Sequence, residues 1–159
     1  MSMDYSEYLY LSHNVSNFVY HIVCPAKYRR IVFDENVEEH LRQICLEIEK
    51  RYDYIKFLEI GADNDHVHFL VQSSPNYSPT QIVKTIKSIT ARQIFVECPQ
   101  VKKKLWGGEF WTDGYFVATV GKNQNETVIK EYVKNQGKQV AEYRQLHLSF
   151  GNIARKDTP

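Results

Sequence analysis

The sequence predicts an α+β fold of the ferredoxin-like, split βαβ type, in which helices cover one face of an antiparallel sheet and a further helix follows at the C-terminal end. Three observations support this fold. Strand-like and helix-like periods follow one another in the order strand, helix, strand, strand, helix, strand. Two neighbouring strand-like runs are joined by a short, turn-rich connector. The 159 residues, 43% of them hydrophobic, suffice for one core. A single domain over residues 1–159 is expected, with its core at about residues 17–146.

The first strand is predicted at residues 18–24, FVYHIVC, a β-branched and aromatic run that stops before Pro25. A helix is then predicted from Asp34, which can act as N-cap, to about Arg51. Its apolar residues recur at helical spacing, at Val37, Leu41, Ile44, Leu46 and Ile48.

Residues 54–60 and 66–72, YIKFLEI and HVHFLVQ, are the next two strand-like runs, and the connector GADND lies between them. We expect the two runs to pair antiparallel as a hairpin. A second helix is predicted from Pro79 to just before Pro99, because proline is favoured in the first helical turn and an apolar stripe follows it. That stripe contains Ile82, Val83, Ile86, Ile89, Ile94 and Phe95.

The chain after Pro99 should pass through a basic, aromatic loop, KKKLWGGEFW, into a fourth strand at residues 115–120, which Gly121 closes. A third helix should begin near Asn123, because Asn123 and Glu126 fit a capping box. The tail beyond about Phe150 has no apolar period and should be frayed.

Composition narrows the function classes. The net charge of +1 and the pI of about 7.7 are short of the overall basicity of many nucleic-acid-binding domains, so any such site must be a local patch. The three cysteines, Cys24, Cys45 and Cys98, form no C-x-x-C pair and indicate reduced thiols in or near the core. The start of the chain lacks a secretory pattern, and no apolar run approaches the length of a membrane span. A soluble, cytoplasmic protein is expected.

The most informative segment is Asp65-His66-Val67-His68-Phe69. Side chains two apart on a strand point to the same face, so His66 and His68 can direct two imidazoles at one metal ion while Val67 and Phe69 pack on the other side. The alternative is that the histidines are hydrogen-bonded strand residues without a metal. The spacing alone leaves both interpretations open.

Tyr132 and Gln136 lie four residues apart on the predicted third helix and therefore share one of its faces. A phenol and an amide oxygen on that face could both reach the two histidines. Taken separately, such a tyrosine is typical of a core or interface, and such a glutamine of a solvated surface. Only the combination with the histidine pair favours a shared site.

Three segments, EIGADNDHVHFLV, WGGEFWTDGYFVATVG and EYVKNQG, resemble in sequence and order the one-tyrosine HUH transposases of small bacterial insertion sequences, which move as single-stranded DNA. The resemblance covers roughly residues 17–143. It implies that His66 and His68 are the HUH pair, that Tyr132 is the single nucleophile, that Gln136 completes a site for Mg²⁺ or Mn²⁺, and that Gly121 is a flexible joint before the tyrosine helix.

The resemblance also implies a metal-dependent endonuclease and strand transferase that works as a homodimer on hairpin ends of a mobile element. In the similar proteins, the histidines of one subunit are paired with the tyrosine helix of the other. The residue chemistry agrees: a metal ion can orient a phosphate for in-line attack, and a tyrosine can displace its 3′ oxygen to give a 5′-phosphotyrosine link and a free 3′-hydroxyl.

DNA contacts are predicted where basic groups lie near aromatic rings, a combination that tracks phosphates and stacks unpaired bases. A solvated surface, and for the tryptophan a core or dimer anchor, is the alternative. The candidates are Lys27, Arg29, Arg30, Lys84, Lys87, Arg92, Lys103, Lys104 and Trp106, with Lys102 and Trp111 beside them in the sequence.

Three other functions fit parts of the sequence. A histidine-triad nucleotide hydrolase would need a third histidine at the position of Leu70. A non-catalytic module could bind single-stranded nucleic acid on exposed sheet aromatics such as Tyr20, Tyr54 or Phe69, but it would not explain the histidines, Tyr132 and Gln136 together. A domesticated relative would act on repeated palindromic elements and often carries extra terminal segments, so this compact chain favours the autonomous transposase.

Overall fold

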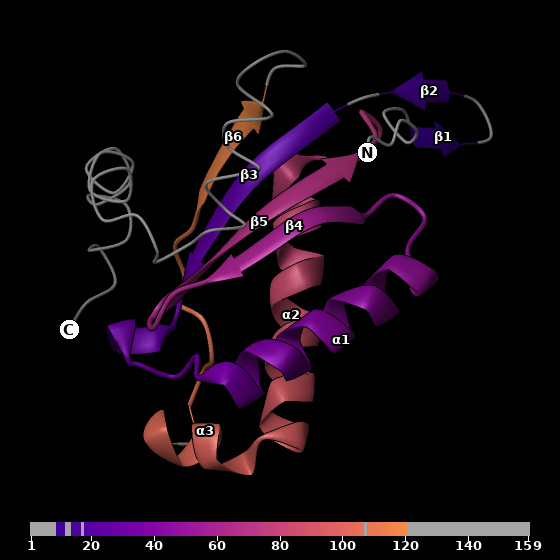
Figure 1. The fold of residues 1–159 in the computed structure, drawn as a ribbon. Coiled ribbons are helices and arrows are strands. Elements are labelled where there is room, and N and C mark those ends of the chain that lie inside the picture. Colours follow the sequence, from indigo (N-terminus) through magenta and orange to yellow (C-terminus); the bar gives the residue numbers. More distant parts are fainter. Residues whose placement is uncertain (1–8, 12–13, 17, 107, 121–159) are drawn as a thin grey trace.

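The computed structural model describes residues 9–11, 14–16, 18–106 and 108–120 (Figure 1). The helix expected near Asn123 lies outside these residues, and so do Gly121, Tyr132 and Gln136. A short antiparallel pair of strands, β1 (Leu9–Leu11) and β2 (Asn14–Ser16), precedes the four-stranded sheet in the sequence. The sequence pattern did not predict this pair.

The sheet contains β3 (Phe18–Pro25), β4 (Lys56–Ala62), β5 (His66–Ser73) and β6 (Phe116–Val120) in the order β4-β5-β3-β6. All three neighbouring pairs are antiparallel. The first and third strands of the βαββαβ pattern therefore lie at the centre of the sheet. This order confirms the predicted ferredoxin-like arrangement.

The two long helices are α1 (Glu35–Arg51) and α2 (Pro79–Glu97), and both cover the same face of the sheet (Figure 1). Each begins at a side-chain cap. Asp34 Oδ1 accepts a hydrogen bond from the Val37 amide at 2.8 Å, as predicted. Ser78 and Gln81 form a reciprocal capping box at the start of α2. The caps fix where each helix begins, and the apolar stripes that follow pack in the core.

Three local predictions were wrong. The second strand begins at Lys56 rather than at residue 54, continues to Ala62, and contains an irregularity between Phe57 and Glu59. Leu46 was assigned to the buried stripe of α1, but it is 49% exposed, and Cys45 occupies the buried position. The basic segment expected as a loop begins at Lys102, but its three lysines belong to α3 (Pro99–Lys104), because Pro99 follows one helix and also fits the first turn of the next.

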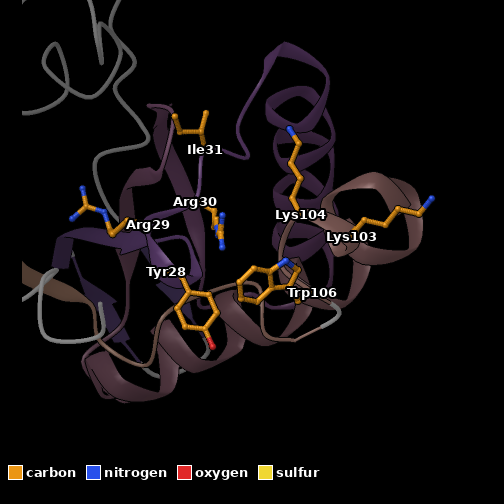
Figure 2. Close-up of a pocket in the computed structure, with 7 residues that line it drawn as sticks. All are labelled: Tyr28, Arg29, Arg30, Ile31, Lys103, Lys104 and Trp106. Carbon is orange, nitrogen blue, oxygen red and sulfur yellow. The ribbon is translucent and has the colours of Figure 1, made fainter. Parts of the chain in front are cut away.

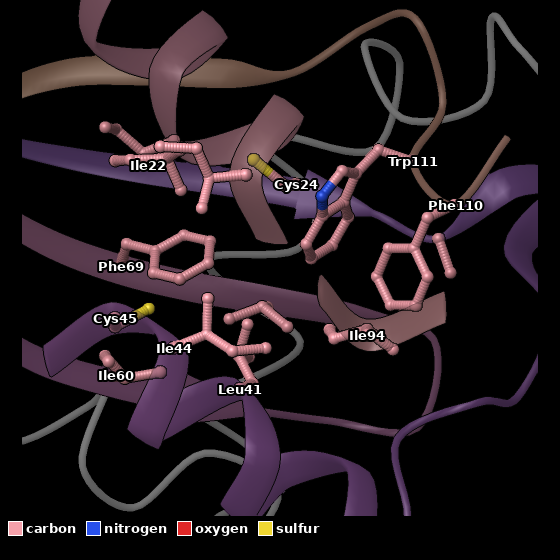
Figure 3. Packing of buried hydrophobic residues seen from close by; sticks show 14 of the residues in the cluster. Ile22, Cys24, Leu41, Ile44, Cys45, Ile60, Phe69, Ile94, Phe110 and Trp111 are labelled. Atoms are coloured by element: carbon pink, nitrogen blue, oxygen red, sulfur yellow. The ribbon is translucent and has the colours of Figure 1, made fainter. Parts of the chain in front are cut away.

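The core lies between the sheet and the helices. Figure 3 shows Ile22 and Phe69 of the sheet packed with Leu41 and Ile44 of α1, and Phe110 and Trp111 extend this cluster along the chain. The buried Trp111 indole donates its N–H to Thr90 Oγ1 at 3.0 Å. Backbone contacts then join this segment to the end of β3, including a hydrogen bond from the Lys27 amide to the Phe110 carbonyl at 2.8 Å.

The cysteines agree with the prediction of buried thiols, because Cys24, Cys45 and Cys98 are all free and buried. Burial raises the pKa of Cys24 to about 12, so this group is a neutral thiol at physiological pH. None of the described helices combines the length and the apolar character that a membrane span requires.

Candidate functional site

The two faces of β5 have different environments. Val67, Phe69 and Val71 belong to the core beneath the helices. His66 and His68 alternate with them and therefore point to the opposite face of the sheet. This alternation confirms the expectation that Val67 and Phe69 pack away from the histidine pair.

The histidine pair is compact and shielded from solvent. His66 and His68 are each 2% exposed, and their ring centroids lie 5.1 Å apart with an interplanar angle of 63°. Two imidazoles at this separation, on one face of one rigid strand, can approach a single ion. The structure therefore brings together the two residues on which the predicted metal site most depends.

Asp65 and Arg29 orient the first imidazole. Asp65 Oδ1 lies 2.7 Å from His66 Nδ1, and Arg29 Nε donates to Asp65 Oδ2 at 3.0 Å. Burial by itself would raise the pKa of the Asp65 carboxyl, but its hydrogen bonds with His66 and Arg29 and the electrostatic effect of these two side chains outweigh burial and lower this pKa. Asp65 is therefore a carboxylate at neutral pH, and its Oδ1 can accept a hydrogen bond from His66 Nδ1–H.

His21 orients the second imidazole, and sequence reasoning missed it. Its Nε2 lies 2.9 Å from His68 Nδ1, and the two rings are stacked with centroids 5.1 Å apart. Burial lowers the pKa of His21 to about 4, so its ring is neutral at physiological pH. One signal was available: His21 is the single strongly polar residue in the run FVYHIVC, and a polar group inside a buried strand requires a partner.

These contacts fit a metal site. Each of the two histidines uses Nδ1 for a neighbouring side chain, so Nε2 is the nitrogen through which each would bind an ion. Within the described ranges, no group of three or more His, Cys, Asp and Glu side chains is placed to hold a metal ion. Gln136, the predicted third ligand, lies beyond those ranges.

The structure divides the predicted DNA-binding residues into three groups, of which the first two share Arg29, and the first group is engaged in protein contacts. Lys27 Nζ lies 3.1 Å from a carboxylate oxygen of Glu109. Lys87 Nζ donates to the Thr112 carbonyl at 2.7 Å. Arg29 pairs with Asp65 as described above. These three side chains stabilise the ends of the sheet and the site, and a role for them in DNA binding stays a prediction.

The second group surrounds a hollow of about 860 Å³ where the short helix η1 (Lys27–Arg29) faces α3. We call it the Trp106 hollow and define it by its lining residues, which are Tyr28, Arg29, Arg30, Ile31, Lys103, Lys104 and Trp106. Figure 2 shows the Tyr28 and Trp106 rings side by side with Arg30 next to them, whereas Arg29 points away from the rings. The structure thus joins residues separated by more than seventy positions in the sequence.

The remaining predicted contacts, Lys84 and Arg92, lie on exposed positions of α2. They line a second depression of about 610 Å³, whose other walls include Phe95, Phe110 and Trp111. Trp111 is 4% exposed and belongs to the core, whereas Trp106 is 76% exposed. Of the two tryptophans, only Trp106 therefore offers a ring to a partner.

Comparison with known proteins identifies the family to which the sequence is similar. Residues 14–136 match the family described as "Transposase IS200 like". The chain is 33% identical over 117 residues to the ISDra2 transposase TnpA of Deinococcus radiodurans, an alignment that covers 74% of this chain and 82% of that protein. It is 32% identical over 130 residues to the transposase for insertion sequence element IS200 of Salmonella typhimurium, with 79% and 81% of the two chains covered.

Two solved structures share the fold. The crystal structure of a candidate transposase from Deinococcus radiodurans superposes with a TM-score of 0.63 at 28% sequence identity, over 80% of this chain and 96% of that one. A REP-associated tyrosine transposase bound to a REP hairpin superposes with a TM-score of 0.56 over 93% and 88% of the two chains. The second pair is 12% identical, so it bears on the fold alone.

Proposed function

Because the chain belongs to the IS200-like family of one-tyrosine HUH transposases of insertion sequences, we propose that it cleaves and rejoins single-stranded DNA ends with Tyr132 as the nucleophile. The observation that carries this proposal is the paired imidazole site on β5, in which both Nδ1 atoms are held by neighbouring side chains. The family match extends over residues 14–136 and so includes the positions of His66, His68, Tyr132 and Gln136.

The metal site that we propose consists of His66, His68 and Gln136. Two imidazole nitrogens and one amide oxygen are a mixed donor set, which suits Mn²⁺ better than Mg²⁺, an ion that strongly prefers oxygen. When bound, the ion supplies Lewis-acid polarisation of the scissile phosphate. His21, Asp65 and Arg29 hold the imidazoles in place, so that little reorganisation accompanies metal binding.

The proposed reaction proceeds in two balanced steps. In cleavage, the Tyr132 oxygen loses its proton and forms a bond to phosphorus, and the bond from phosphorus to the 3′ oxygen breaks. The 3′ oxygen takes up a proton and leaves as a hydroxyl. In joining, a second 3′-hydroxyl loses its proton and forms a bond to phosphorus, the bond from phosphorus to the Tyr132 oxygen breaks, and that oxygen takes up a proton. The phosphodiester bond energy is conserved in the covalent link, so strand transfer needs no ATP.

The substrate class can be tested directly. Labelled oligonucleotides carrying the two flanks of the gene are incubated with the protein, either as single strands or as duplexes, with Mn²⁺ or with chelator. We expect a covalent protein–DNA adduct on denaturing gels only with single strands and Mn²⁺, because a single strand can turn its backbone and unpaired bases toward the site, whereas a duplex holds both in a helix. Equal cleavage of duplex DNA would show that the proposed substrate class is wrong.

We propose a homodimer in which one subunit's histidines work with the other's Tyr132. Mixed Tyr132→Phe and His66→Ala proteins should then regain about a quarter of wild-type cleavage, because about half of the dimers are mixed and each has one complete site. Adduct formation after co-refolding measures this. As control, Tyr132→Phe is mixed with the double variant Tyr132→Phe/His66→Ala, which leaves no nucleophile. Equal, negligible activity in both mixtures would contradict the shared site.

A domesticated relative that acts on repeated palindromic elements is the second candidate. It predicts adducts with dispersed palindromes of the genome rather than with the flanks of the gene, so the same assay separates the two. The non-catalytic binding module loses its main support, because Tyr20 and Phe69, two of the aromatics that it would need exposed, are 7% and 0% exposed.

A further inference from the structure

The Trp106 hollow has an unusual backbone. Among the residues that the structure describes, positive φ outside glycine occurs only at Tyr28 (59°), Arg29 (53°) and Trp106 (58°). Bulky L-residues rarely adopt this region, and such local strain persists mainly where function requires it. All three residues line the same hollow, although they come from two separate segments. The strain is therefore concentrated at one place on the surface.

The side chains of the hollow combine exposed rings with positive charge. Trp106 is 76% and Tyr28 36% exposed, and their ring centroids lie 6.3 Å apart. The Arg30 guanidinium carbon lies 4.6 Å from the centre of the Trp106 ring. Lys103 and Lys104 add two further cations, and no carboxylate is among the described lining residues. An aromatic platform with cations only at its edge suits a base and its phosphate.

The hollow also adjoins the histidine site. Arg29 lines the hollow, and its Nε donates to Asp65, whose other oxygen contacts His66. Two side chains therefore separate the hollow from the first proposed metal ligand. A strand that crosses the hollow can continue to the site of cleavage.

We propose that the Trp106 hollow binds one unpaired base of single-stranded DNA beside the cleavage site. The base stacks on the Trp106 indole, in the place where Arg30 now covers the ring, and Arg30 turns to the adjoining phosphate together with Lys104. A duplex cannot bind in this way, because its bases already stack on one another. This inference rests on the proposed DNA substrate, but not on the chemistry of Tyr132.

The test measures DNA binding by the full chain without cleavage. A fluorescein-labelled oligothymidylate of about 20 nucleotides is titrated with protein in chelator, and anisotropy gives the Kd. We expect Trp106→Ala to weaken binding about 5- to 150-fold, which corresponds to the 1–3 kcal/mol of one stacked base. Trp106→Phe should keep most of the affinity. The matched control is Phe18→Ala, which removes another exposed ring at the far end of β3.

The backbone strain provides a second readout. Glycine tolerates positive φ, so Trp106→Gly should leave the melting temperature unchanged or raise it while single-strand binding falls as in Trp106→Ala. Arg30→Gln should lower the salt dependence of DNA binding, so that the slope of log Kd against log salt concentration is smaller by about 0.7. A purely structural tryptophan would instead lower the melting temperature of Trp106→Gly, and that result would overturn the inference.

Failure of this inference and failure of the proposed function are distinguishable. If Trp106→Ala binds the oligonucleotide like the wild type and still forms the Tyr132 adduct, the base-binding site is wrong and the transposase chemistry stands. If the wild type binds duplex as tightly as single strands and Trp106→Ala changes neither, the inference is overturned together with its substrate. The inference is supported if Trp106→Ala keeps its melting temperature but binds the single-stranded oligonucleotide more weakly than the wild type.

Discussion

Tyr132→Phe is expected to lower formation of the covalent protein–DNA adduct by at least about three orders of magnitude, because phenylalanine keeps the ring but has no oxygen to attack phosphorus. The measurement uses 5′-labelled and 3′-labelled single strands with Mn²⁺ and denaturing gels. Only the fragment downstream of the cut, which carries the 5′ phosphate, should become linked to protein. Peptide mass spectrometry should then locate the nucleotide on Tyr132.

Tyr143→Phe is the matched control, because Tyr143 is the other tyrosine that follows residue 120 in the sequence. It should form the adduct at the wild-type rate. Oligothymidylate binding by Tyr132→Phe should also be unchanged, which shows that the variant is folded and binds its substrate. An adduct that survives in Tyr132→Phe, or one that disappears in Tyr143→Phe alone, would assign the nucleophile elsewhere.

The hydrophobic periods of the sequence predicted the fold because each helix and strand of the sheet packs one apolar face in the core. The first strand, the hairpin and the stripe of α2 are apolar on the faces that the core requires, and the structure confirms them. The exceptions have local causes. Cys45 packs in the core as a small apolar side chain, although its neighbour Leu46 is the more hydrophobic residue. Pro99 is a stop signal and a start signal at once, so α3 resembled a loop.

The histidine pair could be predicted because two strand residues separated by one position share a face whatever the fold. The surroundings could not. His21 is 47 residues from His68 in the sequence and reaches it diagonally, since His21 pairs with Leu70 and Val23 pairs with His68 in the β3–β5 register. A sequence pattern indicates that two strands pair, but the exact register depends on the packing of the whole sheet.

The same limit applies to the basic residues. Sequence proximity grouped Lys27 with Arg30, and Lys103 with Trp106. In space, Arg30 and Trp106 stack on each other, whereas Lys27 pairs with Glu109. Charge and aromaticity identified the right kinds of residue. Only the fold showed which of them share a surface.

Replacement of His66 or His68 by alanine is the second change for which we expect a large effect, namely on metal binding and on adduct formation. His66→Ala or His68→Ala removes one nitrogen ligand, and a divalent ion held by a single imidazole and one amide oxygen binds weakly. We expect at least a hundredfold weaker Mn²⁺ binding by electron paramagnetic resonance or calorimetry, and a comparable loss of adduct. His40→Ala is the matched control, because His40 is half-buried on α1 and pairs with Glu97, away from the site. Normal Mn²⁺ affinity in both site variants would exclude the proposed ligands.

Variants of His21 should distinguish the loss of a metal ligand from the loss of a group that orients a ligand. His21→Ala leaves both ligands in place but removes the group that holds His68 Nδ1, so Mn²⁺ affinity should fall by about 10- to 100-fold, less than for a lost ligand. His21→Gln can still offer an amide oxygen to that nitrogen and should recover part of the affinity. A merely structural role for His21 would lower the melting temperature of both variants equally and leave the Mn²⁺ affinity of the folded protein unchanged. If Mn²⁺ affinity is lowest in the ligand variants, intermediate in His21→Ala and higher in His21→Gln, then β5 presents the imidazole ligands and His21 of β3 fixes the orientation of His68.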